Sequence, residues 1–154
     1  MEYFFEMPVA MGFAPGTEWL VVLTHDGLTV VDAKTGETLA DEPGHSGNAE
    51  GECDPYPVSV VGIGPLIGQR IPVAGLWGGG LKAFTPDGWQ VRRIAPNWPY
   101  EGMVLKVPCD RASSESVKDF LVVKDWGSLR AFGFSDSGQS LVVASEFLSL
   151  WTRD

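Results

Sequence analysis

Short apolar runs separated by turn residues are the dominant pattern of this 154-residue chain. Near the N-terminus, apolar runs at 19–23 and 28–32 flank the dipeptide Asp26-Gly27, and a second turn at 34–36 leads into 37–40. Asp-Gly between two apolar runs is typical of a β-hairpin, because a type I′ turn needs positive φ at both central residues. No stretch shows the 3.6-residue period of an amphipathic helix. The pattern therefore predicts an all-β chain of short antiparallel strands.

A tryptophan-glycine motif occurs twice. Residues 77–84 read WGGGLKAF, and residues 126–132 read WGSLRAF, with one glycine fewer and arginine in place of lysine. Each copy follows an apolar run, at 71–76 and at 120–123. An apolar run, a glycine turn and an alternating segment together predict a β-hairpin at each copy.

A longer stretch is also repeated. Residues 132–143 align with 11–22 when one residue is left out of the turn, and 147–151 correspond to 27–31. The pattern G-F-x-x-x-G-x-x-L-V-V, followed by an alternating strand that ends in Leu-Trp, resembles a blade of a WD40-type β-propeller. The Gly-His dipeptide of that family is absent, and Trp151 is followed by threonine instead of aspartate. The resemblance implies that such a turn joins two strands of one four-stranded sheet.

Chain length limits how these units are assembled. We predict a single all-β domain over residues 1–154, with repeat-like units at about 9–40, 58–94, 103–132 and 132–154. A propeller blade needs roughly 40 residues, and closure usually needs at least about four blades. Two arrangements of the antiparallel hairpin repeats therefore stay open: a small propeller-like assembly, and a compact β-barrel or sandwich. The acidic and aromatic residues 1–8 are expected to form an edge strand or a closing strand.

The charge is distributed unevenly along the chain. The formal net charge is −9, and it lies entirely in residues 1–77, which hold eleven acidic and two basic side chains. Residues 78–154 hold nine of each, and no basic residue lies between Lys34 and Arg70. Such a field attracts cationic partners and repels phosphate backbones. We therefore expect a basic protein partner and no nucleic acid.

Three features favour a cytoplasmic location. No apolar run approaches the roughly 20 residues that a membrane-spanning helix needs, so no membrane association is expected. The first residues are acidic where a secretory signal would be basic. The two cysteines, Cys53 and Cys109, form no C-x-x-C pair and are expected to be unpaired in a reducing compartment.

Motifs of catalysis and cofactor binding are incomplete. The run Gly44-His45-Ser46-Gly47 resembles a nucleophile elbow, but Asn48 stands where the second glycine is required. The glycines of 62–68 resemble a dinucleotide fingerprint with the third glycine one position late. We expect no catalytic residues, no cofactor and no bound metal. A metal held by His45, Cys53 and the neighbouring acids remains the alternative.

The candidate binding residues are an acidic set in and before the loop at 41–57, and aromatic residues that lack a repeat counterpart. Opposite charge accelerates association, and aromatic side chains dominate interface energetics. For Trp89 and Trp98, ordinary packing is the alternative, whereas Trp77 and Trp126 recur and are interpreted as structural. The predicted partner-binding residues are Asp41, Glu42, Glu50, Glu52, Asp54, Trp89, Trp98 and Tyr100.

These observations predict a non-enzymatic protein-binding module. Small size and acidity make the chain similar in character to bacterial immunity proteins, which implies an inhibitor that binds and neutralises a cationic toxin. One alternative is a metal-binding or small-ligand-binding protein, or an enzyme, that uses the loop carboxylates. Another is a structural half-propeller completed by self-association, because an open array leaves sheet edges unpaired.

Overall fold

The computed structural model describes residues 2–3, 7–108, 120–126 and 129–154, and it is all-β as predicted. Every sheet is antiparallel. Sheet A contains, in spatial order, β1 (Glu2–Tyr3), β14 (Leu148–Thr152), β13 (Ser140–Ala144) and β12 (Ala131–Phe134). Sheet B contains β5 (Thr38–Pro43), β4 (Gly27–Asp32), β3 (Trp19–Leu23), β2 (Ala10–Phe13) and β8 (Ala74–Gly75). Sheet C contains β6 (Ser59–Val61) and β7 (Arg70–Pro72), joined by the 3-10 turn η1 (Gly64–Leu66), and sheet D contains β11 (Phe120–Trp126), β10 (Tyr100–Lys106) and β9 (Gln90–Asn97).

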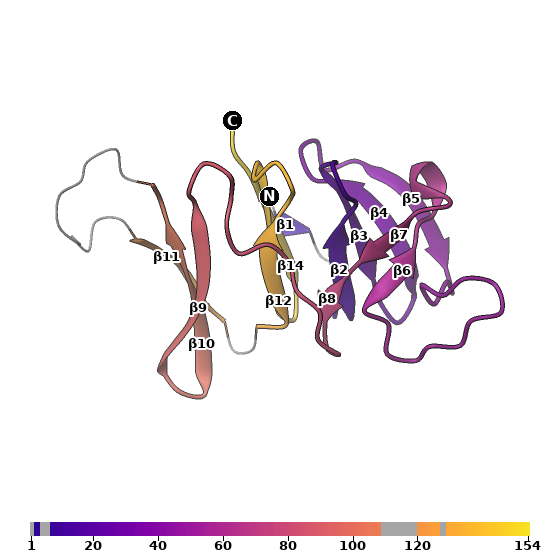
Figure 1. Ribbon diagram of the computed structural model, residues 1–154. Coiled ribbons are helices and arrows are strands. Elements are labelled where there is room, and N and C mark those ends of the chain that lie inside the picture. The colour runs from indigo at the N-terminus through magenta and orange to yellow at the C-terminus, as the bar shows by residue number, and fades with distance from the viewer. Residues whose placement is uncertain (1, 4–6, 109–119, 127–128) are drawn as a thin grey trace.

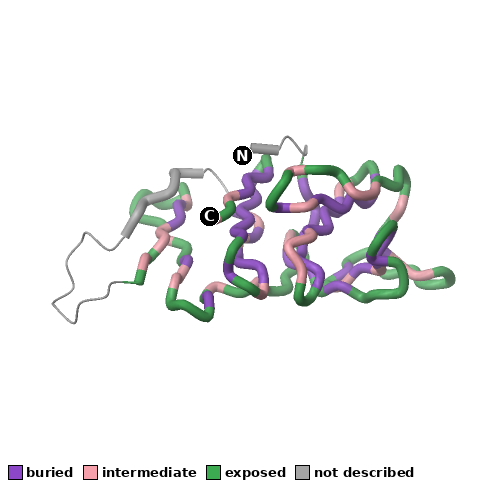
Figure 2. Tube along the Cα trace, turned by 90° about the horizontal axis from the view of Figure 1, so that it is seen from above, coloured by how far each residue is buried: buried purple, intermediate pink, exposed green. Residues whose placement is uncertain are grey.

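The four sheets stand in a row in the order D, A, B, C (Figure 1). An apolar layer lies between each neighbouring pair: one between D and A, one between A and B, and one between B and C. Sheet D lies at one end of the row and sheets B and C at the other (Figure 1), and buried residues gather between the two ends when the molecule is seen from above (Figure 2). Over the described residues the sheets therefore form an open, sandwich-like stack and no closed barrel.

The two inner sheets are buried on both faces, which explains their continuous apolar runs. Successive side chains of a strand point to opposite faces. On β3, Leu20 and Val22 enter the A–B layer, whereas Val21 and Leu23 enter the B–C layer. The residues of β13 are divided in the same way between the A–B and D–A layers. A leucine-valine-valine run is thus the expected sequence of a central strand in this stack.

Two glycines allow a connecting segment to cross a sheet closely. A Cβ atom on Gly12 would lie 2.0 Å from the carbonyl oxygen of Pro72. A Cβ atom on Gly133 would lie 2.2 Å from the Cβ of Leu81. Both distances are far below van der Waals contact, so no larger residue fits at either position without movement of the chain.

The predicted hairpin of 19–32 is confirmed, but its turn lies one residue earlier than expected. Leu23 pairs with Leu28, and the N–H of Thr24 donates to the carbonyl of Gly27 at 2.9 Å. His25 and Asp26 are therefore the central residues. Gly27, with φ of 154°, is required for a different reason: a Cβ there would lie 2.3 Å from the carbonyl oxygen of Glu42 on β5.

The hairpins predicted at the two tryptophan-glycine motifs are wrong. Strand β11 pairs with β10, whereas β12 pairs with β13, so the second copy connects sheet D to sheet A. The first copy leaves sheet B after β8, and Lys82 then forms a bridge with Phe134 of β12. In the first copy, Gly78 and Gly79 have positive φ where the chain leaves sheet B, and the glycine of the second copy lies outside the described residues.

Three further expectations concern the chain's ends and loops. The N-terminal strand is confirmed, because β1 pairs with β14 at the edge of sheet A. The loop predicted at 41–57 begins later, because β5 continues to Pro43. The segment 95–102 forms the tip of the β9–β10 hairpin instead of an irregular loop.

Within the described residues, none of the elements is a helix with the length and apolar character needed to span a membrane.

Candidate functional site

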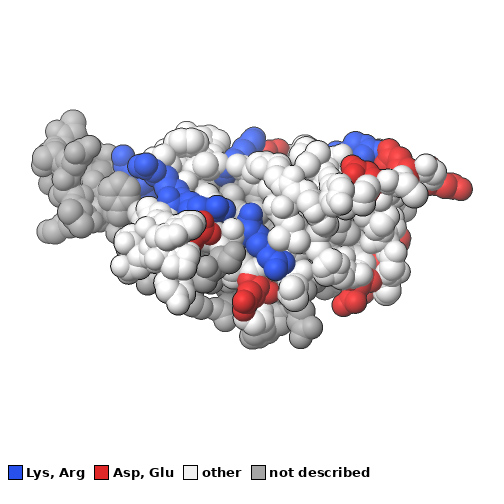
Figure 3. Space-filling view, turned by 90° about the horizontal axis from the view of Figure 1, so that it is seen from below, with Lys and Arg blue, Asp and Glu red and all other residues white. Residues whose placement is uncertain are grey.

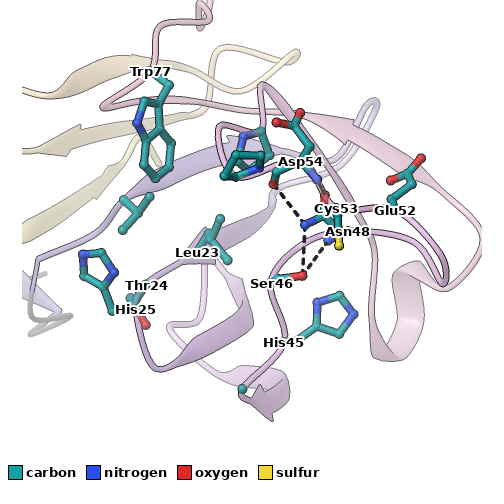
Figure 4. A pocket seen from close by; sticks show the side chains of 14 residues that line it. Leu23, Thr24, His25, His45, Ser46, Asn48, Glu52, Cys53, Asp54 and Trp77 are labelled. Atoms are coloured by element: carbon teal, nitrogen blue, oxygen red, sulfur yellow. Dashed lines mark hydrogen bonds between the residues drawn. The ribbon is translucent and has the colours of Figure 1, made fainter.

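A cleft of about 440 Å³ opens at the sheet B–C end of the row, between the β3–β4 turn and the long loop that follows β5 (Figure 4). The side chains that give it chemical character come from both segments and from the first tryptophan-glycine motif. They are His25, His45, Glu52, Cys53, Asp54 and Trp77. These include both histidines of the chain. We call this cavity the acidic cleft.

Asn48 holds the loop beside the cleft in a closed shape. Its Nδ2 donates to the carbonyl oxygen of Asp54 at 3.1 Å and to the hydroxyl of Ser46 at 3.1 Å (Figure 4). Its Oδ1 accepts the N–H of Asp54 at 3.3 Å. Gly47 lets the loop pack closely against sheet C, because a Cβ atom at this position would lie only 2.7 Å from Cγ1 of Val60. Hydrogen bonds within the loop thus give it a defined conformation despite its polar sequence.

Two neighbours orient the carboxylate of Glu52 and lower its pKa. Its Oε2 accepts the N–H of Ala49 at 3.0 Å, and its Oε1 lies 2.7 Å from Nη2 of Arg70. The Ala49 N–H is the largest cause of the lowered pKa of Glu52, and the Arg70 guanidinium lowers it further. Asp54 is held as well, since its Oδ1 accepts the N–H of Tyr56 at 2.9 Å. Two oriented carboxylates therefore stand at the cleft.

His45 has a defined hydrogen-bonding role. Its Nδ1 accepts the N–H of Gly47 at 2.9 Å, so in the neutral ring the proton lies on Nε2. That Nε2 lies 3.9 Å from the carboxylate of Glu42. Cys53 is an exposed free thiol, and Cys109 lies outside the described residues. No group of three or more His, Cys, Asp or Glu in the described part of the chain is arranged to hold a metal ion.

Two aromatic rings form a wall, of which Trp77 lines the cleft. Tyr56 and Trp77 make an edge-to-face pair with centroids 5.5 Å apart and planes at 61°. Tyr56 is 62% exposed and Trp77 is 37% exposed, so the pair remains accessible. Exposed aromatic surface is a suitable environment for an organic cation. Comparisons of the chain with family models, curated proteins and solved structures found no match.

The five predicted acidic residues lie at one end of the molecule. Asp41 and Glu42 are on β5, the edge strand of sheet B, and Glu50, Glu52 and Asp54 are on the loop that follows it. All five are exposed. Asp41 is partly engaged, because its Oδ1 accepts the hydroxyl of Thr29 at 2.8 Å. We call these five residues, together with the cleft, the acidic end.

The three predicted aromatic residues are not part of the acidic end. Trp98 and Tyr100, 79% and 63% exposed, lie at the tip of the β9–β10 hairpin in sheet D, at the other end of the row (Figure 1). Trp89 is half-buried against the D–A layer, and the guanidinium of Arg153 lies 4.8 Å from its ring centroid. The structure therefore gives Trp89 the packing role that was the alternative to an exposed anchor.

Sequence reasoning missed the aromatic wall. The repeat pattern predicts that Trp77 is part of a hairpin, but the chain changes sheets there and Trp77 lines the cleft. Tyr56 carries a signal that could have been used, since it stands between Pro55 and Pro57 in the acidic loop. Trp98 has a similar setting, between Pro96 and Pro99.

Proposed function

We propose that the protein is a non-enzymatic binding module whose acidic end binds a basic surface of another protein. The observation that carries this proposal is the acidic cleft, which is lined by Glu52, Asp54 and Trp77, with the exposed ring of Tyr56 packed against Trp77. Around it, the exposed acids of β5 and the loop extend the negative field. Charge complementarity over such a surface increases the rate of association.

A lysine or arginine side chain fits the chemistry of this cleft. Its apolar stem packs on aromatic surface, while its charged head is attracted both by ring faces and by carboxylates. Hydrogen bonds between a guanidinium and a carboxylate are about twice as strong as neutral ones. Asp54 is already oriented by the N–H of Tyr56, so this carboxylate needs little ordering on binding, whereas Glu52 is already paired with Arg70. The cleft is thus suited to hold one basic side chain of the partner.

The proposal extends to the biological role. A small acidic protein that covers a basic surface suits an inhibitor of the immunity type, whose partner is a cationic toxin. A cytoplasmic location belongs to the same proposal, and the exposed free thiol of Cys53 supports it, because disulfides are rare in reducing compartments. The immunity-type role and the cytoplasmic location are supported by the composition of the chain and by the acidic end.

The proposal is tested with two baits of equal charge. One carries Glu42→Gln and Glu50→Gln at the acidic end, and the matched control carries Glu146→Gln and Asp154→Asn, two exposed acids elsewhere. Partners captured from native host lysate at low and high salt are identified by mass spectrometry, purified and measured by surface plasmon resonance. We expect the acidic-end variant to slow association by about 3- to 10-fold and to flatten its salt dependence.

The control variant separates the site from the overall charge. It is expected to associate at nearly the wild-type rate, since its changes lie in the turn between β13 and β14 and at the C-terminus. Equal slowing by both variants would mean that only net charge matters. Unchanged association in the acidic-end variant would contradict the proposal.

A further inference from the structure

A second cavity, of about 370 Å³, lies where three sheets present edge strands to one another. Its lining comes from β8 of sheet B, from β12 of sheet A with the residue before it, from β9 of sheet D, and from the glycine run of the first tryptophan-glycine motif. It is separate from the acidic cleft, although Trp77 lines the cleft and the next residue, Gly78, lines this cavity.

The charge of this cavity is opposite to that of the acidic end. Arg93 and Arg130 line it, and no acidic residue is among the described residues that do. On the face seen from below, basic side chains gather in a band that runs from the sheet D end toward the middle of the molecule (Figure 3). A cavity with two guanidinium groups is therefore present in a protein whose net charge is −9. We call it the arginine cavity.

Both arginines are held in place mainly by neutral acceptors. Nη2 of Arg93 donates to the carbonyl oxygen of Leu129 at 3.1 Å, and Nη1 of Arg130 donates to that of Pro8 at 2.8 Å. One carboxylate is close, since Oε1 of Glu101 lies 3.4 Å from Nη1 of Arg93, but its other oxygen accepts the N–H of Leu129 at 3.0 Å. Among the described residues Glu101 is the one acid paired with these two arginines, so positive charge is in excess, and each guanidinium has further N–H donors.

The glycine run adds backbone donors and space. Gly78 and Gly79 have φ of 96° and 87°, and a Cβ on Gly79 would lie 2.1 Å from the carbonyl oxygen of Val73. The N–H groups of Gly79 and Gly80 have no hydrogen-bond partner among the described residues. A Cβ on Gly80 would meet no atom within 4 Å. Accessible backbone N–H groups next to arginines form a favourable environment for an anion.

We propose that the arginine cavity binds the carboxylate or phosphate group of a small molecule between Arg93 and Arg130. The planar guanidinium matches both groups with paired N–H donors. The volume lies in the range of small-ligand pockets, about 300–1,000 Å³. The proposal is independent of partner binding, because the acidic end has the opposite charge and different residues.

The test is isothermal titration calorimetry of the full chain with inorganic phosphate and, separately, with citrate, each against sodium chloride at equal ionic strength. Saturable binding of either anion beyond the chloride control is expected, and the comparison distinguishes phosphate from carboxylate. Arg93→Gln and Arg130→Gln are each expected to weaken the affinity at least about 10-fold, the usual effect of losing a charge-assisted hydrogen bond.

Arg92→Gln is the matched control, because Arg92 precedes Arg93 on β9, carries the same charge and does not line the cavity. It is expected to bind as the wild type does. Gly80→Phe is the second variant, since it fills open space while both arginines remain; it is expected to abolish binding with an unchanged circular dichroism spectrum. Binding no stronger than the chloride effect, or equal losses in Arg92→Gln and Arg93→Gln, would overturn the proposal.

Discussion

Replacing Leu20 with alanine tests the layered packing of the stack. Leu20 is completely buried on β3 and points into the A–B layer. The change removes three carbon atoms, which at about 0.8 kcal/mol for each buried methylene gives about 2.4 kcal/mol of lost transfer free energy. The cavity left behind increases this cost, and buried Leu→Ala changes range from about 2 to 5 kcal/mol. We expect the free energy of unfolding to fall by about 3 to 4 kcal/mol.

Equilibrium unfolding in urea, followed by tryptophan fluorescence and by far-UV circular dichroism, measures this loss. With a slope of about 2 kcal/mol per molar urea, the midpoint is expected to decrease by about 1.5 to 2 M. Leu76→Ala is the control, because Leu76 is 49% exposed, and its cost is expected to stay below about 1 kcal/mol. If Leu20→Ala cost less than about 1 kcal/mol, or no more than Leu76→Ala, the assignment of Leu20 to a packed layer between two sheets would be refuted.

Three further predictions follow from single contacts. Gly12→Ala is expected to destabilise the fold by more than about 2 kcal/mol, because its Cβ would lie 2.0 Å from the Pro72 carbonyl, whereas Gly80→Ala is expected to be nearly neutral in the same urea titration. The hydrogen bond from Arg153, and then that from Thr85, lowers the pKa of Asp87 from 3.8 to about 2. A lowered folded-state pKa stabilises the fold above the unfolded pKa, so the stability difference between wild type and Asp87→Asn is expected to be constant above about pH 4 and to shrink between pH 4 and 2; a pH-independent difference would contradict this. Cys53 is exposed, so its thiol is expected to react with a disulfide reagent in the folded protein, and protection that is lost only on unfolding would contradict its placement.

The strands could be predicted because the physical reason for them is local. Leucine-valine-valine runs at 20–22 and 141–143 are buried on both faces, and a turn glycine precedes each run, Gly16 with φ of 72° and Gly138 with φ of 74°. The pairing of strands was harder to predict. A glycine turn after an apolar run is compatible with a hairpin and with a crossover to another sheet. At 126–132 the second arrangement occurs, because β12 pairs with β13.

The candidate sites could also be predicted only where their residues are close together in the sequence. The acidic residues were predictable because they are close together in sequence and exposed by their charge. Tyr56 and Trp77 meet only because the loop after β5 folds back over the chain where it leaves sheet B. Arg93 and Arg130 come from different parts of the chain, and only the stacking of sheets D and A brings them to one cavity. Sites built from loops and sheet junctions therefore depend on tertiary contacts that local patterns do not contain.

The central claim is that the acidic cleft binds basic side chains, and an NMR titration tests it most directly. Uniformly ¹⁵N-labelled protein is titrated with a peptide rich in lysine and arginine, and with the same peptide carrying glutamine at each basic position. A Trp77→Phe variant assigns the indole signal. The account predicts saturable shifts of the Trp77 indole N–H and of loop amides at 46–57, weakened by salt and absent with the neutral peptide. Shifts elsewhere on the protein, or equal shifts with both peptides, would contradict it.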